Sequence, residues 1–386
     1  MRRLPEPSAR VGNRQFSSLV PREAFNNPLQ LRSPMTFNRN LEPLVECVAE
    51  HTVGRDMESE DWQKAVALNG LLELEDETYH ETVLEFVNRS IETQTSTGQF
   101  SYGSLDPRQR PDYAGDWYTG DMSAGRQIGH HVNPAALGPA VLDMYERTGE
   151  ADYLEAARRQ YQYLRDIKRV DGAIPQHGEN ELWLDSAYML CPFFSRYGSV
   201  CDDPDAFDEA AHQIRTLSAH LHDNDTGLFR HTWRQTPNSF PQSMFWGRGN
   251  GWIMAGIVDT LATLPADHTD RDKIVQTFRT AARAIRDRQD ASGYWHNTID
   301  DTQTALEGSG TLLFAYAFMK AYEMGILEND AYRIAARDAV EVCCGSVDDK
   351  GRVHRIAIPP GGPNAPFGVT SYGQGAFLLA AAQFIG

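Results

Sequence analysis

The 386-residue sequence predicts an all-α fold, an (α/α)6 barrel of six helical hairpins. Two observations lead to this fold class. Five segments share one plan, in which a polar turn opens an amphipathic helix and a second polar turn, containing glycine, follows it. The stretches between them are mostly apolar and rich in small residues. Amphipathic outer helices alternating with apolar inner ones are typical of a closed ring. The alternative, an open solenoid, has shorter and more regular repeats.

The repeat places the elements in order along the chain. The glycines that follow the outer helices suit the left-handed conformation that closes a helix; they are Gly98, Gly172, Gly227, Gly293 and Gly351. Inner helices are expected over 134–145, 182–194, 251–264 and 312–324. Residues 41–50 and the final YGQGAFLLAAAQF supply a sixth pair. Because inner helices open onto one mouth, chemistry is expected where polar groups interrupt them.

Composition and charge limit the possible partners. Residues 1–40 are polar and contain several prolines, so we expect an irregular N-terminal extension before a single catalytic domain, 41–386. The formal net charge of −17 argues against nucleic acid and anionic membranes, because both require clustered Lys and Arg. No segment approaches the about 20 apolar residues of a membrane span. The oligomeric state stays open.

The cysteines and the short motifs indicate the compartment and the cofactors. Five cysteines, an odd number, favour reduced thiols, and residues 1–40 lack the apolar core of a signal peptide, so a cytoplasmic location is expected. No Cys or His pattern has zinc spacing, and neither the phosphate-binding loop nor the dinucleotide fingerprint occurs. The sequence therefore predicts no metal and no cofactor.

Asp185 interrupts the apolar stretch ELWLDSAYML, which otherwise has the composition of an inner helix. An ionised carboxylate is costly to bury unless it is paired or keeps its proton. Beside Trp183 and Tyr188, Asp185 is expected to have a raised pKa, which would suit a general acid near neutral pH. A structural aspartate bonded to a neighbouring helix end is the alternative.

A glycine-rich stretch, FWGRGNGW, is the second interruption. Its three glycines are expected to keep it non-helical until Trp252 and to let the backbone approach a ligand closely. Trp246 and Trp252 offer faces for stacking, and Arg248 offers a guanidinium fork that fits a carboxylate. A packed aromatic turn is the alternative.

Further candidates lie at other predicted helix starts. They are His231 in GLFRHTW, His130 and His131 in GHHVNP, Asp116 and Trp117 in the preceding loop, His177 ahead of Asp185, and Tyr372 in TSYGQGAF. A lone histidine is more often structural, and two adjacent histidines point in different directions. Aromatic faces, an arginine, histidines and a protonatable carboxylate together fit a sugar acid better than a phosphorylated ligand.

Five motifs in this order, LWLDSAYM, GLFRHTW, FWGRGNGW, SGYWHNTIDD…ALEGSGTLLFAYAFMKA and YGQGAFLLA, resemble the unsaturated uronyl hydrolases. Among these, the unsaturated rhamnogalacturonyl hydrolases of glycoside hydrolase family 105, related to family 88, are most similar. The resemblance runs from about Trp62 to the end and implies an (α/α)6 barrel. It also implies Asp185 as the acid and base, with His231, Trp246 and Arg248 lining the pocket.

The activity that the resemblance implies is an uncommon hydrolysis. The substrate is an oligosaccharide left by a polysaccharide lyase, with a 4,5-unsaturated uronic acid at its non-reducing end. The enzyme protonates the C4=C5 double bond and adds water at C5, and the resulting hemiketal opens and releases the neighbouring sugar. One carboxyl group suffices, in contrast to the two of ordinary glycosidases. The parent polysaccharide and the leaving sugar stay open.

One departure from the family pattern leaves alternatives. These families usually carry a second aspartate just ahead of the Asn-Pro motif, where this sequence has His130 or His131. A cationic histidine could hold the substrate carboxylate, or Asp116 or Asp121 could replace the missing aspartate. Other functions for such a barrel are an inverting glycosidase, an epimerase and a non-catalytic sugar-binding protein. The glycosidase would pair Asp185 with Asp116 or Glu307, and the epimerase would use His130, His231 and His296.

Overall fold

The computed structural model describes residues 40–57, 62–101, 131–176, 180–359 and 361–385. All of them belong to one compact unit, Phe37–Gly386. Apart from Asn40, the extension predicted over 1–40 lies outside the described residues. Within the described ranges, no helix is both long enough and apolar enough to cross a membrane.

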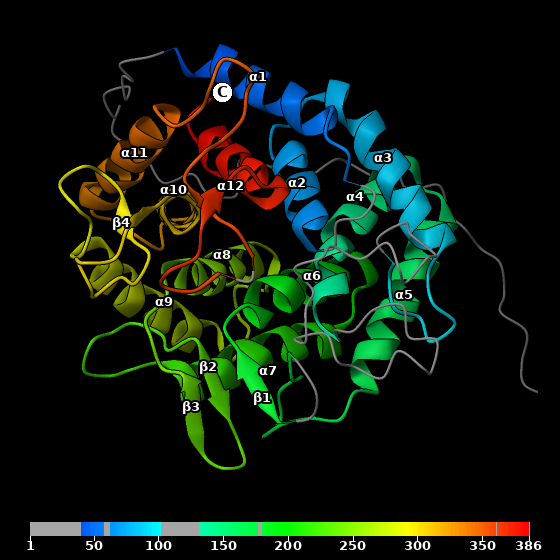
Figure 1. Cartoon of the computed structure of the whole chain (residues 1–386). Coiled ribbons are helices and arrows are strands. Elements are labelled where there is room, and N and C mark those ends of the chain that lie inside the picture. Colours follow the sequence, from blue (N-terminus) through cyan, green and yellow to red (C-terminus); the bar gives the residue numbers. More distant parts are fainter. Residues whose placement is uncertain (1–39, 58–61, 102–130, 177–179, 360, 386) are drawn as a thin grey trace, which may run out of the picture. The chain divides into compact units, whose positions relative to one another are not determined.

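Amphipathic helices form the outer layer of this unit (Figure 1). In the described part of the chain they are α1 (Leu41–Val53), α3 (Glu77–Glu92), α5 (Ala151–Arg165), α7 (Pro204–Leu221), α9 (Arg271–Arg286) and α11 (Asp330–Cys344). Their buried residues recur every three or four positions, as Ala206, Ala210, Ile214 and Leu217 do in α7. Such spacing gives each helix one apolar face, which packs inward.

The inner layer consists of helices that are buried almost all round. They are α2 (Trp62–Leu72), the short 3-10 helix η5 (Asn133–Leu137) with α4 (Gly138–Thr148), α6 (Ser186–Cys201), α8 (Gly247–Thr263), α10 (Gly308–Glu323) and α12 (Ser371–Ala382). Along this ring each helix packs against the next, and α12 returns to pack against α2 (Figure 1). The predicted (α/α)6 barrel is confirmed, with α2 as an inner helix that the sequence pattern did not single out.

The repeat glycines link neighbouring hairpins. All five have the expected positive φ, between +72° and +97°. A Cβ atom on each would lie 2.1–2.9 Å from an atom of the next outer helix. The facing residues are Arg159 of α5, His212 of α7, Ala284 of α9, Asp338 of α11 and, for Gly351, Cys47 of α1. Glycine is therefore required here for close approach as well as for its φ angle.

Short strands precede four of the inner helices. In the described residues, β1 (Glu181–Trp183), β2 (Thr232–Arg234) and β3 (Ser239–Gln242) form an antiparallel sheet in that order. β4 (Trp295–His296) pairs with β5 (Leu306–Glu307), and β6 (Ile356–Ala357) pairs with β7 (Phe367–Gly368). The sheets thus lie at the N-terminal ends of α6, α8, α10 and α12.

Two helix starts differ from the sequence prediction. The helix expected over 182–194 begins only at Ser186, because the preceding residues pair with β2 as strand β1. Conversely, α8 begins at Gly247 although its glycines were expected to prevent helix formation before Trp252. A Cβ on Gly251 would lie 2.8 Å from Leu313 of α10, so close helix packing compensates for the low helix propensity of glycine.

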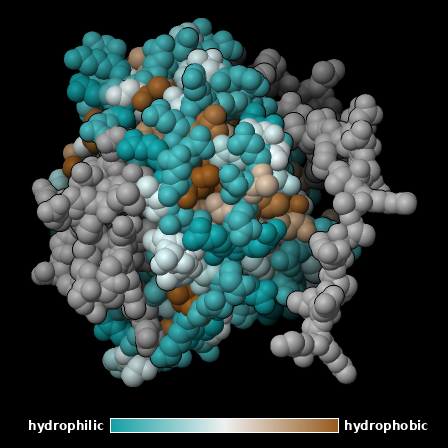
Figure 2. Space-filling model, turned by 90° about the vertical axis from the view of Figure 1, so that its right-hand side faces the viewer, coloured by the Kyte–Doolittle hydropathy of each residue, from teal (hydrophilic) through white to brown (hydrophobic). Residues whose placement is uncertain are grey.

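The surface is largely polar. Figure 2 shows one face, on which hydrophilic residues predominate and apolar residues form small separate areas. Among the described large apolar residues, Phe240 and Ile334 are exposed, at 41% and 45%. Both are single exposed side chains, which soluble proteins commonly carry.

Candidate active site

A cavity of about 490 Å³ lies where the β1–β2–β3 sheet meets the start of α8. Its walls include Trp183, His231, Gln242, Trp246, Gly361 and Gly362. Each of these comes from β1, from the β2–β3 region, from the residue before α8, or from the segment after β6. This is the mouth at which the sequence pattern places the chemistry.

Asp185 is joined to the cavity wall through His231. Asp185 is the N-cap residue of α6, directly after β1, and the backbone N–H of Leu184 donates to the carbonyl oxygen of His231 over 3.1 Å. This strand pairing places Nε2 of His231 2.9 Å from Oδ2 of Asp185. Nδ1 of His231 lies 2.6 Å from Oε1 of Gln242. The side chains of His231 and Asp185 are 4% and 18% exposed.

The pKa of Asp185 is lowered, in contrast to the raised pKa predicted from its apolar neighbours. Burial is the largest single influence and by itself raises the pKa. The charge and hydrogen bond of His231, together with the charge of Arg248, outweigh burial and bring the pKa of Asp185 below its usual 3.8. The prediction was wrong because both cationic groups come from distant segments that only the fold brings close.

Trp246 and Arg248 form a stacked pair at the start of α8. The Arg248 guanidinium lies 4.2 Å from the centroid of the Trp246 ring, and it donates hydrogen bonds to the carbonyl oxygen of Ala357 (2.8 Å) and the hydroxyl of Tyr372 (2.5 Å). Burial raises the pKa of Tyr372 to about 12, so this hydroxyl stays protonated near neutral pH. The ring of His231 contacts Trp246 at 4.7 Å between centroids. The structure thus brings Asp185, His231, Trp246 and Arg248 together.

Trp252 and Tyr372 lie deeper, in the interior of the barrel. Both are fully buried. The ring of Trp252 packs against Tyr188 at 4.8 Å and, edge to face, against Trp62 at 5.9 Å. Trp252 therefore exposes no face for stacking in this structure, and Tyr372 borders the site through its bond to Arg248.

The remaining candidates lie elsewhere or outside the described residues. Nδ1 of His131 is 2.8 Å from the hydroxyl of Tyr163 in α5, so this contact joins His131 to the outer layer. His130, His177, Asp116 and Trp117 lie outside the described residues. Where the structure does describe the chain, no three His, Cys, Asp or Glu side chains gather as a possible metal site.

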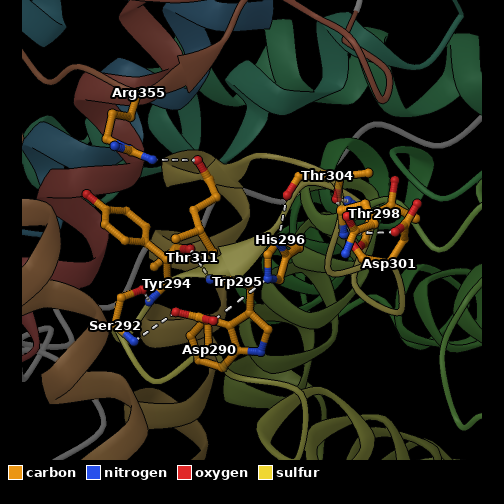
Figure 3. Close-up of polar contacts among 12 residues, drawn as sticks. Asp290, Ser292, Tyr294, Trp295, His296, Thr298, Asp301, Thr304, Thr311 and Arg355 are labelled. Atoms are coloured by element: carbon orange, nitrogen blue, oxygen red, sulfur yellow. Dashed lines mark hydrogen bonds and ion pairs between the residues drawn. The ribbon is translucent and has the colours of Figure 1, made fainter.

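Glu307, the candidate for an inverting glycosidase, and His296, a candidate for an epimerase, both bond to other parts of the protein. Glu307 is 1% exposed, and its carboxylate accepts backbone N–H bonds from Ser309 and Gly310 at the start of α10, each 2.8 Å long. His296 lies in β4, with Nδ1 2.6 Å from the carbonyl oxygen of Thr304 and Nε2 3.8 Å from Asp290 (Figure 3). None of these contacts of Glu307 and His296 involves Asp185.

Three amides at the site were not predicted. Gln242 bonds His231, and Asn297 accepts a bond from the Trp246 indole (3.1 Å). Gln176 donates to Asn133 of η5 (2.7 Å) and accepts from Ser186 at the start of α6 (2.8 Å). Asparagine and glutamine are common on surfaces, and only their contacts in the folded structure distinguish these three.

Comparison with known proteins places the chain in a family. A sequence profile described as Glycosyl Hydrolase Family 88 matches residues 46–385. The chain is 24% identical over 328 residues to the unsaturated rhamnogalacturonyl hydrolase YesR of Bacillus subtilis (strain 168), covering 82% of this chain and 85% of that protein. It is 26% identical over 278 residues to an unsaturated 3S-rhamnoglycuronyl hydrolase of Alteromonas sp. (strain LOR), covering 66% and 67%.

Solved structures share the fold. A protein from Klebsiella pneumoniae subsp. pneumoniae MGH 78578, described as a possible member of the GH105 family, superposes with a TM-score of 0.75 at 21% identity, covering 93% of this chain and 96% of that one. The unsaturated glucuronyl hydrolase of Bacillus sp. GL1 superposes with a TM-score of 0.64 at 14% identity, covering 89% and 96%. The family profile spans nearly the whole described barrel, and the chain therefore belongs to glycosyl hydrolase family 88.

Proposed function

We propose that this protein hydrolyses lyase-generated oligosaccharides and releases the 4,5-unsaturated uronic acid from their non-reducing end. The observation that carries the proposal is the Asp185–His231 pair beside the stacked Trp246–Arg248 pair, at the mouth of a family 88 barrel. One carboxyl group with a proton-bearing partner, next to a cation and an aromatic face, fits an acidic unsaturated sugar.

Asp185 performs both proton transfers. Its carboxyl group donates a proton to C4, so the electrons of the C4=C5 double bond form the new C4–H bond and C5 becomes an oxocarbenium ion. The Asp185 carboxylate then takes a proton from a water molecule as the water oxygen bonds to C5. The C5–O5 bond of the hemiketal then breaks, C5 becomes a ketone, and the proton of the C5 hydroxyl passes to O5. C1 is now a hemiacetal; its bond to the leaving sugar breaks as C1 becomes an aldehyde, and the O5 proton passes to the leaving oxygen.

His231 is the proposed source of the proton that Asp185 donates to the substrate. Nδ1 of His231 faces the amide oxygen of Gln242 and Nε2 faces Asp185, so each ring nitrogen has an acceptor oxygen within hydrogen-bond distance. An N–H at Nε2 can pass its proton to Oδ2 of Asp185 across this contact. A carboxylate with a lowered pKa can therefore still receive a proton for the chemical step.

Substrate binding is proposed for the residues around this pair. The positive charge of Arg248 attracts the carboxylate of the uronic acid, and the ring of Trp246 provides an aromatic surface for the sugar to contact. We retain His130, His131, His177, Asp116 and Trp117 as proposed contributors, with His130 or His131 in place of the second family aspartate.

The test is the loss of ultraviolet absorbance from the conjugated double bond. The protein is incubated with unsaturated disaccharides of several uronic acids, with saturated disaccharides alongside. We expect the signal to fall with wild type and to persist with Asp185→Asn, a change that removes the proton donor. Asp272→Asn, on the exposed side of α9, is the matched control and should retain wild-type activity.

Other outcomes separate the competing functions. Cleavage of the saturated disaccharides would indicate an ordinary glycosidase instead. Binding of unsaturated disaccharides without any loss of absorbance, equal in wild type and Asp185→Asn, would indicate a sugar-binding barrel.

We also propose a cytoplasmic location. In the described residues none of the five cysteines forms a disulfide bond, and Cys191, Cys343 and Cys344 are buried. Reduced thiols are usual in the cytoplasm, whereas exported proteins tend to carry disulfides. Fractionation of producing cells, with the activity assayed in each fraction, tests this; activity in the medium or the envelope would contradict it.

A further inference from the structure

Asn297, the residue after β4, bonds to two separate segments of the cavity region, Trp246 with Gly247 and Gly362. Its side-chain Oδ1 accepts a hydrogen bond from the Trp246 indole over 3.1 Å, and its Nδ2 donates to the carbonyl oxygen of Gly362 over 2.6 Å. Its backbone oxygen accepts from the N–H of Gly247, the first residue of α8, over 2.8 Å. Asn297 is fully buried, so these bonds are shielded from water.

The indole bond sets the orientation of Trp246. A tryptophan has a single hydrogen-bond donor, and here Asn297 occupies it. The same ring lies 4.2 Å from the Arg248 guanidinium and 4.7 Å from the ring of His231. Rotation of the indole would disturb both contacts, so the orientation of Trp246 affects the charged groups beside Asp185.

The second bond holds the part of the cavity wall formed by Gly361 and Gly362. Gly361 has φ +93°, and a Cβ there would lie 2.3 Å from the Trp246 ring and 2.5 Å from a guanidinium nitrogen of Arg248. The backbone of this segment therefore lies directly against the stacked pair. Gly362, the next residue, is fastened by the amide of Asn297.

We infer that Asn297 is a positioning residue that holds Trp246 and the Gly361–Gly362 wall in one arrangement and so sets the fit of the sugar ring in the cavity. The amide of Asn297 accepts the indole bond and donates to the carbonyl oxygen at once. An aspartate accepts but cannot donate, and it would place a carboxylate beside the Gly362 carbonyl oxygen. Leucine, of similar shape, does neither.

The effect belongs to binding more than to the chemical step. Asp185 and His231 are attached to β1 and β2, and none of their hydrogen bonds in the described residues involves Asn297. Asn297→Asp and Asn297→Leu are expected to raise KM for the unsaturated disaccharide roughly 10- to 100-fold, with a smaller change in kcat. This kinetic expectation rests on the proposed function.

A matched control exists in the same molecule. Asn238 accepts a bond from the indole of Trp233 over 2.7 Å, and neither residue lines the cavity. Asn238→Leu removes an indole–amide bond of the same kind and should leave KM within about twofold of wild type.

The first experiment is titration of Asp185→Asn protein, with and without Asn297→Leu, with unsaturated disaccharide. We expect Asn297→Leu to weaken binding roughly 10- to 100-fold while the far-ultraviolet spectrum stays native. Unchanged binding would overturn the inference. The inference would also be overturned if Asn297→Leu alone, with Asp185 intact, lost kcat as much as binding and had a lowered Tm. That result would show that Asn297 only stabilises the fold.

A second measurement needs no substrate. Subtracting the fluorescence spectrum of Trp246→Phe from that of wild type gives the spectrum of Trp246 with Asn297 present. Subtracting the spectrum of the Asn297→Leu/Trp246→Phe double variant from that of Asn297→Leu gives the spectrum of Trp246 without Asn297. A shift between the two difference spectra supports the inference, and identical spectra contradict it. If wild type binds no unsaturated disaccharide, the proposed function fails, but this measurement still decides whether Asn297 positions Trp246.

Discussion

At the scale of single residues, the proposed chemistry depends on which atom of the Asp185–His231 pair holds the proton. His231 lowers the pKa of Asp185 through its charge and its hydrogen bond, against the opposite effect of burial. The ionised carboxylate is therefore stabilised in the folded protein. That contribution is present above the ordinary pKa of 3.8 and is lost as the pH falls through the lower, folded-state pKa.

The pH profile of kcat tests this balance. Because the protonated carboxyl group of Asp185 is the proposed acid, kcat should fall as the pH rises through the pKa at which this group loses its proton. In His231→Gln the charge and hydrogen bond that lower the pKa of Asp185 are gone and burial dominates, so this pKa rises. The fall in kcat should then move to higher pH by about one pH unit or more. A fall that stays at the same pH would show that His231 does not set the pKa of Asp185.

The sequence located the separate parts of the site better than it described their environment. Asp185, His231, Trp246 and Arg248 stood out because each interrupts an apolar or glycine-rich pattern, and the fold brings them together. The pKa of Asp185 could not be inferred, since it depends on distances between segments remote in the chain. Asn297 and Gln242 carry no signal in a single sequence, because their roles come from contacts that only the fold creates.

At the scale of elements, hairpin repeats were the most predictable feature and helix starts the least. The outer helices follow from their amphipathic spacing. By contrast, Gln63, Lys64 and Asn69 interrupt the apolar residues of α2, although Lys64 is only 1% exposed. Its amino group lies 5.0 Å from the ring of Phe86 in α3, an interaction that requires the folded barrel.

The glycine contacts between hairpins lead to a stability prediction. Gly293→Ala combines a φ of +95° with a Cβ 2.7 Å from the backbone oxygen of Asp338, so we expect a loss of about 2–4 kcal/mol in unfolding free energy. Gly149→Ala is the control, because Gly149 has φ +72° but no atom within 4 Å of its Cβ position. It should lose only about 1 kcal/mol.

Denaturant unfolding followed by circular dichroism measures both variants. Equal losses for the two alanines would mean that contact with the next hairpin contributes nothing beyond backbone strain.

At the scale of the whole molecule, the barrel separates its chemistry from a second charged cluster. Near the C-terminal ends of α8 and α10, the Lys320 ammonium lies 2.9 Å from Asp259 and 3.5 Å from Glu73, which follows α2. Lys320 also donates to the hydroxyl of Tyr316 over 2.6 Å. Burial raises the pKa of Asp259, and the two carboxylates raise the pKa of Lys320 in spite of burial. One cation thus balances two acidic groups from different inner helices.

Removal of that cation should destabilise the barrel without changing the chemistry at its mouth. Lys320→Met leaves Asp259 and Glu73 facing each other, and we expect a loss of about 3–5 kcal/mol at neutral pH. The loss should shrink as the pH falls through the raised pKa of Asp259, because that carboxylate then takes up a proton. Lys273→Met on α9, whose side chain is 69% exposed, should have no measurable effect.

Thermal unfolding at several pH values gives the comparison, and kcat is measured well below Tm. If the stability lost in Lys320→Met did not depend on pH, its electrostatic origin would be contradicted. If kcat were reduced while the protein is fully folded, the two ends of the barrel would be coupled.

The contact between Gly351 and α1 has a consequence for how the architecture can vary. In an open array a repeat can be gained or lost, since each unit meets only its neighbours. Here the same kind of glycine contact that joins successive hairpins also joins the last of these turns to the first helix. The angles between neighbouring hairpins must then add up to one full turn. A change in the angle at one contact therefore requires opposite changes in the angles at the other contacts. Insertions are therefore tolerated in the connections at the mouth, whereas an added hairpin would force the circle open.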